Sequence, residues 1–408
     1  MTGRILHVYK HFRPTFTGEG VFLERLAPVM AELRPDVAHE VLVTTTPPPP
    51  EAPSLAGIAD IHYLASPETG APQRDIVRWL ARNAERYDVV HHHTHVDRTF
   101  LGALQLKLKG RRIVLSATLD DSLQGLLRGY RPAFRPLVRR LFGLIDQFVA
   151  ISPRLHEENL QVAPAGKSAL VPIGIHIPPE GDVSAAAREK LGLRIDAKVL
   201  ICVGGLCRRK DQLFLIEQLP DLVRETPELV LVLVGPDVES DYRSLLQRRV
   251  DELGLAAHVV FAGHADEPWD YYRAADLMVF ASREEGFGTV VIEAMAHGLP
   301  IVARRLPGVN DTFVDHGVSG YLYDDADAYR RFVAGLIADP VGSRTMGRSG
   351  RAFVAARYRI EDIAARYLEL YGFAPNRHAA VAPLRASVSP GPYTDAEVSA
   401  AGLKVRAQ

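Results

Sequence analysis

A glycine-rich turn between two glutamates holds the residues best suited to chemistry. The segment Ser282–Pro300 begins Ser-Arg-Glu-Glu-Gly-Phe-Gly-Thr-Val-Val-Ile-Glu and directly follows a short apolar run. Gly286 and Gly288 let a ligand approach the backbone closely. A helix is expected to begin at Gly288 or Thr289 and to end before Pro300. The pattern predicts a strand, a ligand-binding turn and a helix.

The amino end of such a helix presents free backbone amides and a positive dipole end. It favours a phosphate or an electron-rich sugar oxygen. Glu285 precedes the helix and Glu293 lies in its first turns. Eight positions apart, these carboxylates cannot form an acid–base pair on one turn. They suit two separate tasks along an extended ligand, each accepting hydrogen bonds from hydroxyls such as those of ribose and a sugar.

A basic loop follows the first apolar run of the second half. Val203–Asp211 reads Val-Gly-Gly-Leu-Cys-Arg-Arg-Lys-Asp and opens a helix. Lys210 can neutralise a diphosphate while its bond to a sugar breaks, which stabilises most in a dry site. A solvated basic turn is the alternative interpretation, and it fits Arg208 as well as a catalytic role does.

The order of these motifs resembles glycosyltransferase family 4, a retaining family with the GT-B fold. Its hallmark is two glutamates separated by seven residues around Gly-Phe-Gly, which Glu285 and Glu293 match. The resemblance implies that Glu285 contacts the donor sugar and that Glu293 binds the ribose. It also implies that the turn and the following amides hold sugar and phosphate, through Gly286, Phe287, Gly288, Thr289 and Val290.

The resemblance extends from about Val199 to Tyr323. Lys210 matches a lysine of the family, but Gly205 replaces its usual arginine, so Arg208 or Arg209 is the candidate for that charge. His264 ends a segment that resembles the place where the family seats the nucleotide base. Glu285, Lys210, Arg208 and Asp120 are the expected catalytic residues.

The first half matches the family less closely. Gly18 and Gly20 resemble a glycine-rich loop near the donor phosphate and the acceptor, with a plain turn as the alternative. Related enzymes commonly carry Thr-x-His where this chain has Asp120. An aspartate could orient the acceptor hydroxyl or hold a sugar hydroxyl, and a register shift of one would give that role to Asp121.

Three alternate histidines raise the question of a metal. His91, His93 and His95 would share one strand face if the strand continued. Neither a carboxylate nor a cysteine joins them at a typical ligand spacing, and the family often carries His-x-His here. We therefore interpret them as cleft lining. Because no Asp-x-Asp metal site is evident, we expect no metal site and no cofactor, and a UDP- or GDP-sugar as co-substrate.

The segment 129–142 is basic, lacks acidic residues and interleaves aromatic with aliphatic residues. It suits a partly amphipathic helix on anionic lipid, an ordinary domain surface, or arginines that bind an acidic acceptor. A peripheral membrane contact is therefore one expectation among three.

Apolar runs alternate with amphipathic segments, which predicts parallel sheets with helices on both faces. The expected strands are Ile5–Tyr9, Glu40–Thr44, Val89–His93, Ile113–Ser116, Gln147–Ile151, Val199–Gly204, Leu229–Gly235, Val259–Ala262, Leu277–Ala281 and Ile301–Ala303. The expected helices include Val21–Leu33, Asp75–Arg86, Arg98–Lys109 and Ile360–Tyr371, with a linker over Val171–Ile195.

We therefore expect an α/β fold of the GT-B type, with two doubly wound Rossmann-like domains facing across a cleft. The acceptor-side domain covers 1–175 and is completed by helix 358–373. The nucleotide-sugar domain covers 176–357, and a loose tail covers 374–408. Ligands in such sheets bind outside the carboxyl ends of the strands.

The amino-acid composition excludes several classes of protein. The 408 residues are 47% hydrophobic and 24% charged with a net charge of −1, which gives no global field for nucleic acid. Two cysteines provide neither a disulfide framework nor a metal-ligand set. Without a signal peptide or a spanning segment, we expect a cytoplasmic protein that could contact the inner face of a membrane.

The expected activity is retaining transfer of a hexose-type sugar from a nucleotide donor to a glycan, lipid-linked or small-molecule acceptor. The alternatives are a non-catalytic nucleotide-sugar-binding protein and an epimerase or phosphorylase on the same fold. A dehydrogenase is disfavoured, because Gly18 and Gly20 lack the third glycine and the downstream acid of a dinucleotide fingerprint.

Overall fold

The computed structural model describes residues 3–15, 17–51, 53–65, 70–95, 97–117, 122–181 and 184–374. The chain divides into two compact units. Unit 1 contains the residues up to Ile175 and the stretch from Tyr358 to the end of the described chain. Unit 2 runs from His176 to Arg357. Asp120, Asp121 and the expected tail from 375 onward lie outside the described residues.

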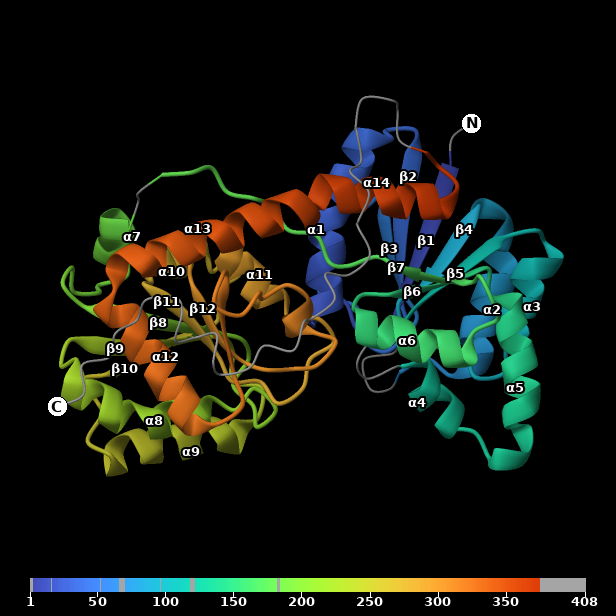
Figure 1. Ribbon diagram of the computed structural model, residues 1–408. Helices are drawn as coiled ribbons and strands as arrows, with labels where there is room; N and C mark the ends of the chain where they lie inside the picture. The colour runs from blue at the N-terminus through green and yellow to red at the C-terminus, as the bar shows by residue number, and fades with distance from the viewer. Residues whose placement is uncertain are drawn as a thin grey trace. The chain divides into compact units, whose positions relative to one another are not determined.

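Unit 1 is a parallel sheet with helices on both faces (Figure 1). Its strand order, β3-β2-β1-β4-β5-β6-β7, reverses between β1 and β4. The strands are β1 Gly3–Tyr9, β2 Val37–Val43, β3 Asp60–Tyr63, β4 Val89–His92, β5 Arg112–Ala117, β6 Gln147–Ala150 and β7 Ser168–Leu170. The helices are α1 Gly18–Leu33, α2 Gln73–Asn83, η1 Ala84–Arg86, α3 Leu101–Leu108, α4 Leu123–Arg128, η2 Pro132–Phe134, α5 Arg135–Leu141, η3 Phe142–Leu144, α6 Pro153–Val162 and α14 Ile360–Tyr371.

Two apolar cores fill unit 1, one on each face of its sheet. On one face α1 and α14 pack against side chains such as Ile5, Val41 and Val89. On the other face α2 to α6 pack against Leu6, Val90 and their neighbours. The strands are apolar on both faces because both are covered, as in a doubly wound sheet.

Unit 2 repeats this architecture with a six-stranded parallel sheet of order β10-β9-β8-β11-β12-β13. The strands are β8 Lys198–Val203, β9 Leu229–Val234, β10 Val259–Gly263, β11 Leu277–Phe280, β12 Ile301–Arg304 and β13 Gly320–Tyr323. The helices are α7 Ser184–Lys190, α8 Gln212–Glu225, α9 Ser240–Glu252, α10 Trp269–Ala274, α11 Thr289–Ala296, η4 Asn310–Thr312, α12 Ala326–Ala338 and α13 Pro340–Arg357. The order reverses between β8 and β11, so ligands are expected where these two strands end.

Three local expectations were wrong. The expected linker Val171–Ile195 contains α7. Arg188 of this helix is buried, where it donates to the backbone oxygens of Ala274 and Ala197 and pairs with Asp276.

The expected glycine-rich loop near Gly18 is instead the first turn of α1, since Thr17 caps the helix by accepting from the amide of Gly20.

The expected helix Arg98–Lys109 begins later, at Leu101, because Phe100 has a left-handed backbone with φ of 59°. Helix α14 has the bounds predicted from the sequence and ends at Gly372, whose φ is 90°. Within the described ranges, none of the helices combines the length and the apolar character that crossing a bilayer requires.

Candidate active site

The basic loop and the glycine-rich turn lie at the switch point of the unit 2 sheet. Strand β8 leads into 204–211 and β11 leads into 281–288, and these strands are neighbours in the sheet. Parallel neighbours have their carboxyl ends at one edge, so the two loops meet there. The lysine and the first glutamate of the sequence motifs therefore come together although 75 residues separate them.

Lys210 and Glu285 form an ion pair at this edge. The Nζ of Lys210 lies 2.5 Å from Oε1 of Glu285, and Nη1 of Arg209 lies 3.3 Å from its Oε2. The side chains of Lys210 and Glu285 are only 14% and 10% exposed, whereas that of Arg209 is 44% exposed. One partly buried carboxylate thus lies between two cations, in a place where charge interactions are screened less than in water.

Backbone contacts join the same two loops. The amide of Arg283 donates to the carbonyl oxygen of Arg209 at 2.9 Å, and Nη1 of Arg209 donates to the carbonyl oxygen of Glu284 at the same distance. These bonds fix the spacing between Lys210 and Glu285 from the main chain as well as from their side chains.

Asp211 completes the connection, and sequence reasoning missed its role. Its carboxylate is buried and accepts a bidentate pair of bonds from Arg283 at 2.9 and 3.1 Å and a bond from Arg304 at 2.8 Å. Its backbone is left-handed, with φ of 55°. The sequence predicted the start of a helix at Asp211, but its side chain does not cap α8. Its pairing with Arg283 and Arg304 depends on tertiary contacts, which no local pattern signals.

Helix α11 begins beside this cluster, after the turn predicted from the sequence. Gly288 is its N-cap, with a left-handed φ of 93° that favours glycine. Because Gly288 has no side chain to cap the helix, the amides of Thr289 and Val290 begin α11 without one. Gly286 precedes Phe287, which is buried against Phe313 with ring centroids 5.5 Å apart. The turn is thus anchored by an aromatic pair while its backbone carries the polar groups.

Glu293 lies in the same helix, one turn beyond its start, and is 8% exposed. Its Oε2 accepts a hydrogen bond from the Tyr272 hydroxyl at 3.0 Å, and the same hydroxyl lies 3.3 Å from the carbonyl oxygen of Val290. Tyr272 therefore orients the carboxylate of Glu293.

Arg208 and His264 lie apart from this cluster. Arg208 pairs with Glu239 at 2.6 Å and with Asp241 at 2.5 Å at the start of α9, and these bonds raise its pKa. Arg209 rather than Arg208 therefore shares Glu285 with Lys210. His264 follows β10, two strands from β8, and its Nε2 lies 3.3 Å from Asp266.

In unit 1, Gly18 and Gly20 lie in the first turn of α1. A Cβ at Gly18 would meet no heavy atom within 4 Å, whereas at Gly20 it would lie 3.0 Å from Oγ1 of Thr17 and 3.2 Å from the ring of Phe12. Gly18 is therefore open toward its surroundings, and Gly20 is glycine because the cap packs on it.

The histidines form a cluster that the sequence predicted only in part. The rings of His91 and His93 are tilted by 31° with centroids 3.9 Å apart, and His7 hydrogen-bonds His93 and His39 at 3.1 Å each. His95 would share this face only if the strand continued, but β4 ends at His92, and His95 contacts Tyr130 and Phe100.

Each ring nitrogen of His91 has a partner, Nδ1 with the Tyr371 hydroxyl at 2.6 Å and Nε2 with Ser116 at 2.8 Å. A metal bound by the lone pair of His91 would replace one of these bonds. The three rings of His7, His91 and His93 do place one nitrogen each within 4.8 Å of the others, but hydrogen bonding already satisfies this arrangement.

Burial lowers the pKa of His39 to about 4 and that of His91 to about 3, and holds those of His7 and His93 well below 6.5. Unfolded histidines bind protons near pH 6.5, so in this range the unfolded chain takes up more protons. The free energy of unfolding should then fall as the pH falls from about 6.5 toward 4.

We predict that unit 1 loses stability over this acidic range, by about 1.4 kcal/mol per pH unit for each histidine that stays neutral when folded. Urea unfolding at a series of pH values, followed by the fluorescence of Trp79, measures the loss. His39→Gln should flatten the dependence, and a pH profile identical to that of the wild type would contradict the assignment.

Known protein families match both units of the chain. The family described as "Glycosyl transferases group 1" matches residues 183–353, and that described as "Glycosyltransferase Family 4" matches residues 16–177. A GDP-mannose-dependent alpha-(1-6)-phosphatidylinositol monomannoside mannosyltransferase of Mycolicibacterium smegmatis is 33% identical over 286 residues, 66% of this chain and 72% of the relative. A D-inositol 3-phosphate glycosyltransferase of Thermobispora bispora is 28% identical over 400 residues, 91% of this chain and 93% of the relative.

Solved structures share the fold over nearly the whole chain. Sucrose-phosphate synthase from Thermosynechococcus elongatus has a TM-score of 0.70 at 25% identity, covering 91% of this chain and 98% of that chain. The Anabaena protein HepE in complex with UDP and glucose has a TM-score of 0.72 at 22% identity, covering 91% and 99%. The fold and the site define a glycosyltransferase of the GT-B fold. The chain belongs to glycosyltransferase family 4.

Proposed function

We propose that this glycosyltransferase moves a sugar from a nucleoside-diphosphate donor to an acceptor hydroxyl with retention of anomeric configuration. The observation that carries the proposal is the meeting of Lys210, Glu285 and the amino end of α11 at one switch point. A cation, a carboxylate and the amino end of a helix without a side-chain cap are what a sugar diphosphate needs along its length.

In the proposed reaction the bond between the anomeric carbon and the diphosphate oxygen breaks, and the acceptor hydroxyl enters from the same face. Lys210 and the first amides of α11 stabilise the charge that grows on the leaving phosphate. Glu285 accepts hydrogen bonds from the donor sugar and so holds the anomeric carbon in place. In this proposal the reaction needs neither a cofactor nor a divalent metal, because Lys210 and the first amides of α11 supply the positive charge that the leaving diphosphate requires.

The names of the relatives support a nucleotide-sugar donor: one is described as GDP-mannose-dependent, and the HepE structure contains UDP and glucose. Two relatives are named for acceptors that contain an inositol phosphate group. We infer a UDP- or GDP-sugar donor and a glycan, lipid-linked or small-molecule acceptor.

A thermal-shift screen of UDP-, GDP- and ADP-sugars tests the donor, because a ligand that binds the folded state raises the melting temperature. NMR of the product made by the selected donor then gives the anomeric configuration. An inverted product would overturn retention. A rate abolished by EDTA and restored by a divalent ion would overturn the metal-independent mechanism.

We predict that Glu293→Gln weakens binding of the donor nucleotide. A buried carboxylate oriented by Tyr272 accepts ribose hydroxyl bonds more strongly than an amide, so the dissociation constant should rise about tenfold or more. Calorimetry with the nucleoside diphosphate alone measures the change. Glu284→Gln, an exposed glutamate of the preceding turn, is the matched control, and an unchanged affinity in Glu293→Gln would remove this residue from the ribose.

A further inference from the structure

One segment of unit 1 carries several positive charges and has no acidic residues to neutralise them. Thirteen residues from Arg128 to Arg140 contain five arginines, and the sequence from 122 to 145 has neither Asp nor Glu. In the part of the chain that the structure describes, none of these five forms an ion pair with a carboxylate. Arg13, Arg34 and Arg86 of the same unit do form such pairs.

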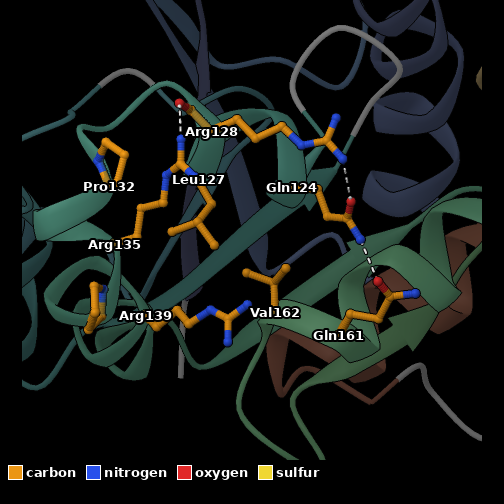
Figure 2. A pocket seen from close by; sticks show the side chains of 9 residues that line it. Gln124, Leu127, Arg128, Pro132, Arg135, Arg139, Gln161 and Val162 are labelled. Carbon is orange, nitrogen blue, oxygen red and sulfur yellow. Dashed lines mark hydrogen bonds between the residues drawn. The ribbon is translucent and has the colours of Figure 1, made fainter.

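Three of these arginines line a hollow of about 540 Å³ between α4, α5 and α6 (Figure 2). Arg135 donates to the backbone oxygens of Arg128 and Tyr130 at 3.1 Å each, which fixes its guanidinium at the wall of the hollow. Arg128 donates to Gln124, which in turn donates to Gln161.

Arg139 is one helical turn beyond Arg135 and faces the same hollow, as the view of its side chain in Figure 2 indicates. Guanidinium groups bind phosphate oxygens in a bidentate manner. The hollow therefore has the charge that binding a phosphate group requires.

Apolar side chains are exposed on the same segment and beside it. Phe134 and Leu137 are 54% and 53% exposed. On α3, Leu101, Leu104 and Leu108 are 52%, 43% and 79% exposed and form one stripe. Helix α3 contacts η3, the turn that continues α5, so its exposed leucines lie on an element adjacent to the arginine segment.

We propose that this surface, the segment 122–144 with α3, docks on an anionic lipid bilayer. The arginines of the hollow bind lipid phosphate groups, and Phe134 and Leu137 enter the interface. A site for a soluble phosphate would leave the exposed Phe134, Leu137 and α3 leucines without a role, which is why the lipid is the occupant. The proposal goes beyond donor chemistry, because it concerns unit 1 alone.

Sedimentation with vesicles of phosphatidylcholine, with and without phosphatidylglycerol, tests it. The protein should bind only the anionic vesicles, and less at high salt. R128Q/R139Q should lower the partition coefficient roughly 25-fold, about fivefold for each charge. F134S/L137S should lower it by more than about tenfold. R224Q/R248Q, which removes two positive charges from unit 2, is the matched control and should change it by less than about twofold.

Circular dichroism shows whether a variant folds, and the thermal shift given by UDP and GDP shows whether it still binds the donor nucleotide. Folding and nucleotide binding should survive in every variant, so a loss of vesicle binding then reports on docking alone. The proposal is overturned if the wild type ignores anionic vesicles, or if R128Q/R139Q binds them as the wild type does. It is also overturned if inorganic phosphate raises the melting temperature of the wild type but not of R128Q/R139Q while vesicles have no effect, since the hollow would then hold a soluble phosphate.

Discussion

Lys210→Met is expected to lower kcat by about a thousandfold, because it removes the cation closest to the carboxylate and the phosphate of the proposed donor. Lys210 is 14% exposed, so water cannot replace its charge. Arg209 remains 3.3 Å from Glu285 but is 44% exposed. Arg209→Gln should therefore lower kcat less, by about tenfold.

Steady-state rates with saturating donor measure this effect, and nucleotide affinity measured by calorimetry shows whether the loss is in binding or in turnover. Glu285→Gln should keep the nucleotide affinity and lose turnover, because Glu285 is proposed to contact the donor sugar and not the nucleotide. Lys190→Met removes another ion-paired lysine of unit 2, one that is 71% exposed, and should leave the rate within about twofold. Turnover at the wild-type level in Lys210→Met would contradict the mechanism.

Arg208→Gln tests which of two adjacent arginines, Arg208 or Arg209, acts at the site, a choice that the sequence left open. The pairs of Arg208 with Glu239 and Asp241 hold it at the start of α9. The sequence could not distinguish Arg208 from Arg209, because the two residues are identical and adjacent. They differ only in the loop that each side chain contacts. The meeting of Arg209 with Glu284 and Glu285 depends on the register of β8 against β11.

The glycine-rich turn could be predicted from the sequence because its signals are local. Gly288 and the apolar run before it define a strand, a left-handed residue and a helix start within about a dozen residues. Helix α14 was predictable for the same reason, since its apolar period and Gly372 lie in one segment.

The elements that were missed lack such local signals. Strand β3 is only four residues long and only partly buried, so its alternation of polar and apolar side chains is too brief to identify a strand. Helix α7 is held by Arg188, whose partners Ala274 and Asp276 are far along the chain. The histidine cluster needs His7 and His39, which come from two other strands of the sheet. Contacts of this kind follow from strand order, which no single segment encodes.

Among the residues whose roles depend on contacts far along the chain, Asp211 is the one closest to the proposed chemistry. It adjoins Lys210, and its partner Arg283 lies two residues before Glu285, so its carboxylate joins the two halves of the ion pair. Its left-handed backbone is one that Asp and Asn tolerate better than Ala. Strain at a non-glycine residue persists where surrounding contacts hold it, and here Arg283 and Arg304 provide those contacts.

We predict that Asp211→Asn lowers the free energy of unfolding by about 2 kcal/mol and kcat by about a hundredfold. The energy lies below the usual cost of breaking a buried ion pair because Arg283 is 67% exposed. The rate falls because Lys210 and Glu285 lose their fixed spacing, and a small misplacement of reacting groups is costly. Urea unfolding followed by Trp269 fluorescence and steady-state kinetics measure the two effects.

Two further variants separate charge from backbone strain at this position. Asp211→Gly keeps the left-handed backbone but loses the carboxylate, so it should resemble Asp211→Asn. Asp211→Ala should be less stable than Asp211→Gly by about 1 kcal/mol, the penalty of a left-handed backbone for a residue with a Cβ. If Asp211→Asn unfolds at the same urea concentration as the wild type and retains its kcat, the bonds from Arg283 and Arg304 do not position the site. In that case the spacing of Lys210 and Glu285 depends on the backbone bonds between Arg209, Arg283 and Glu284 alone.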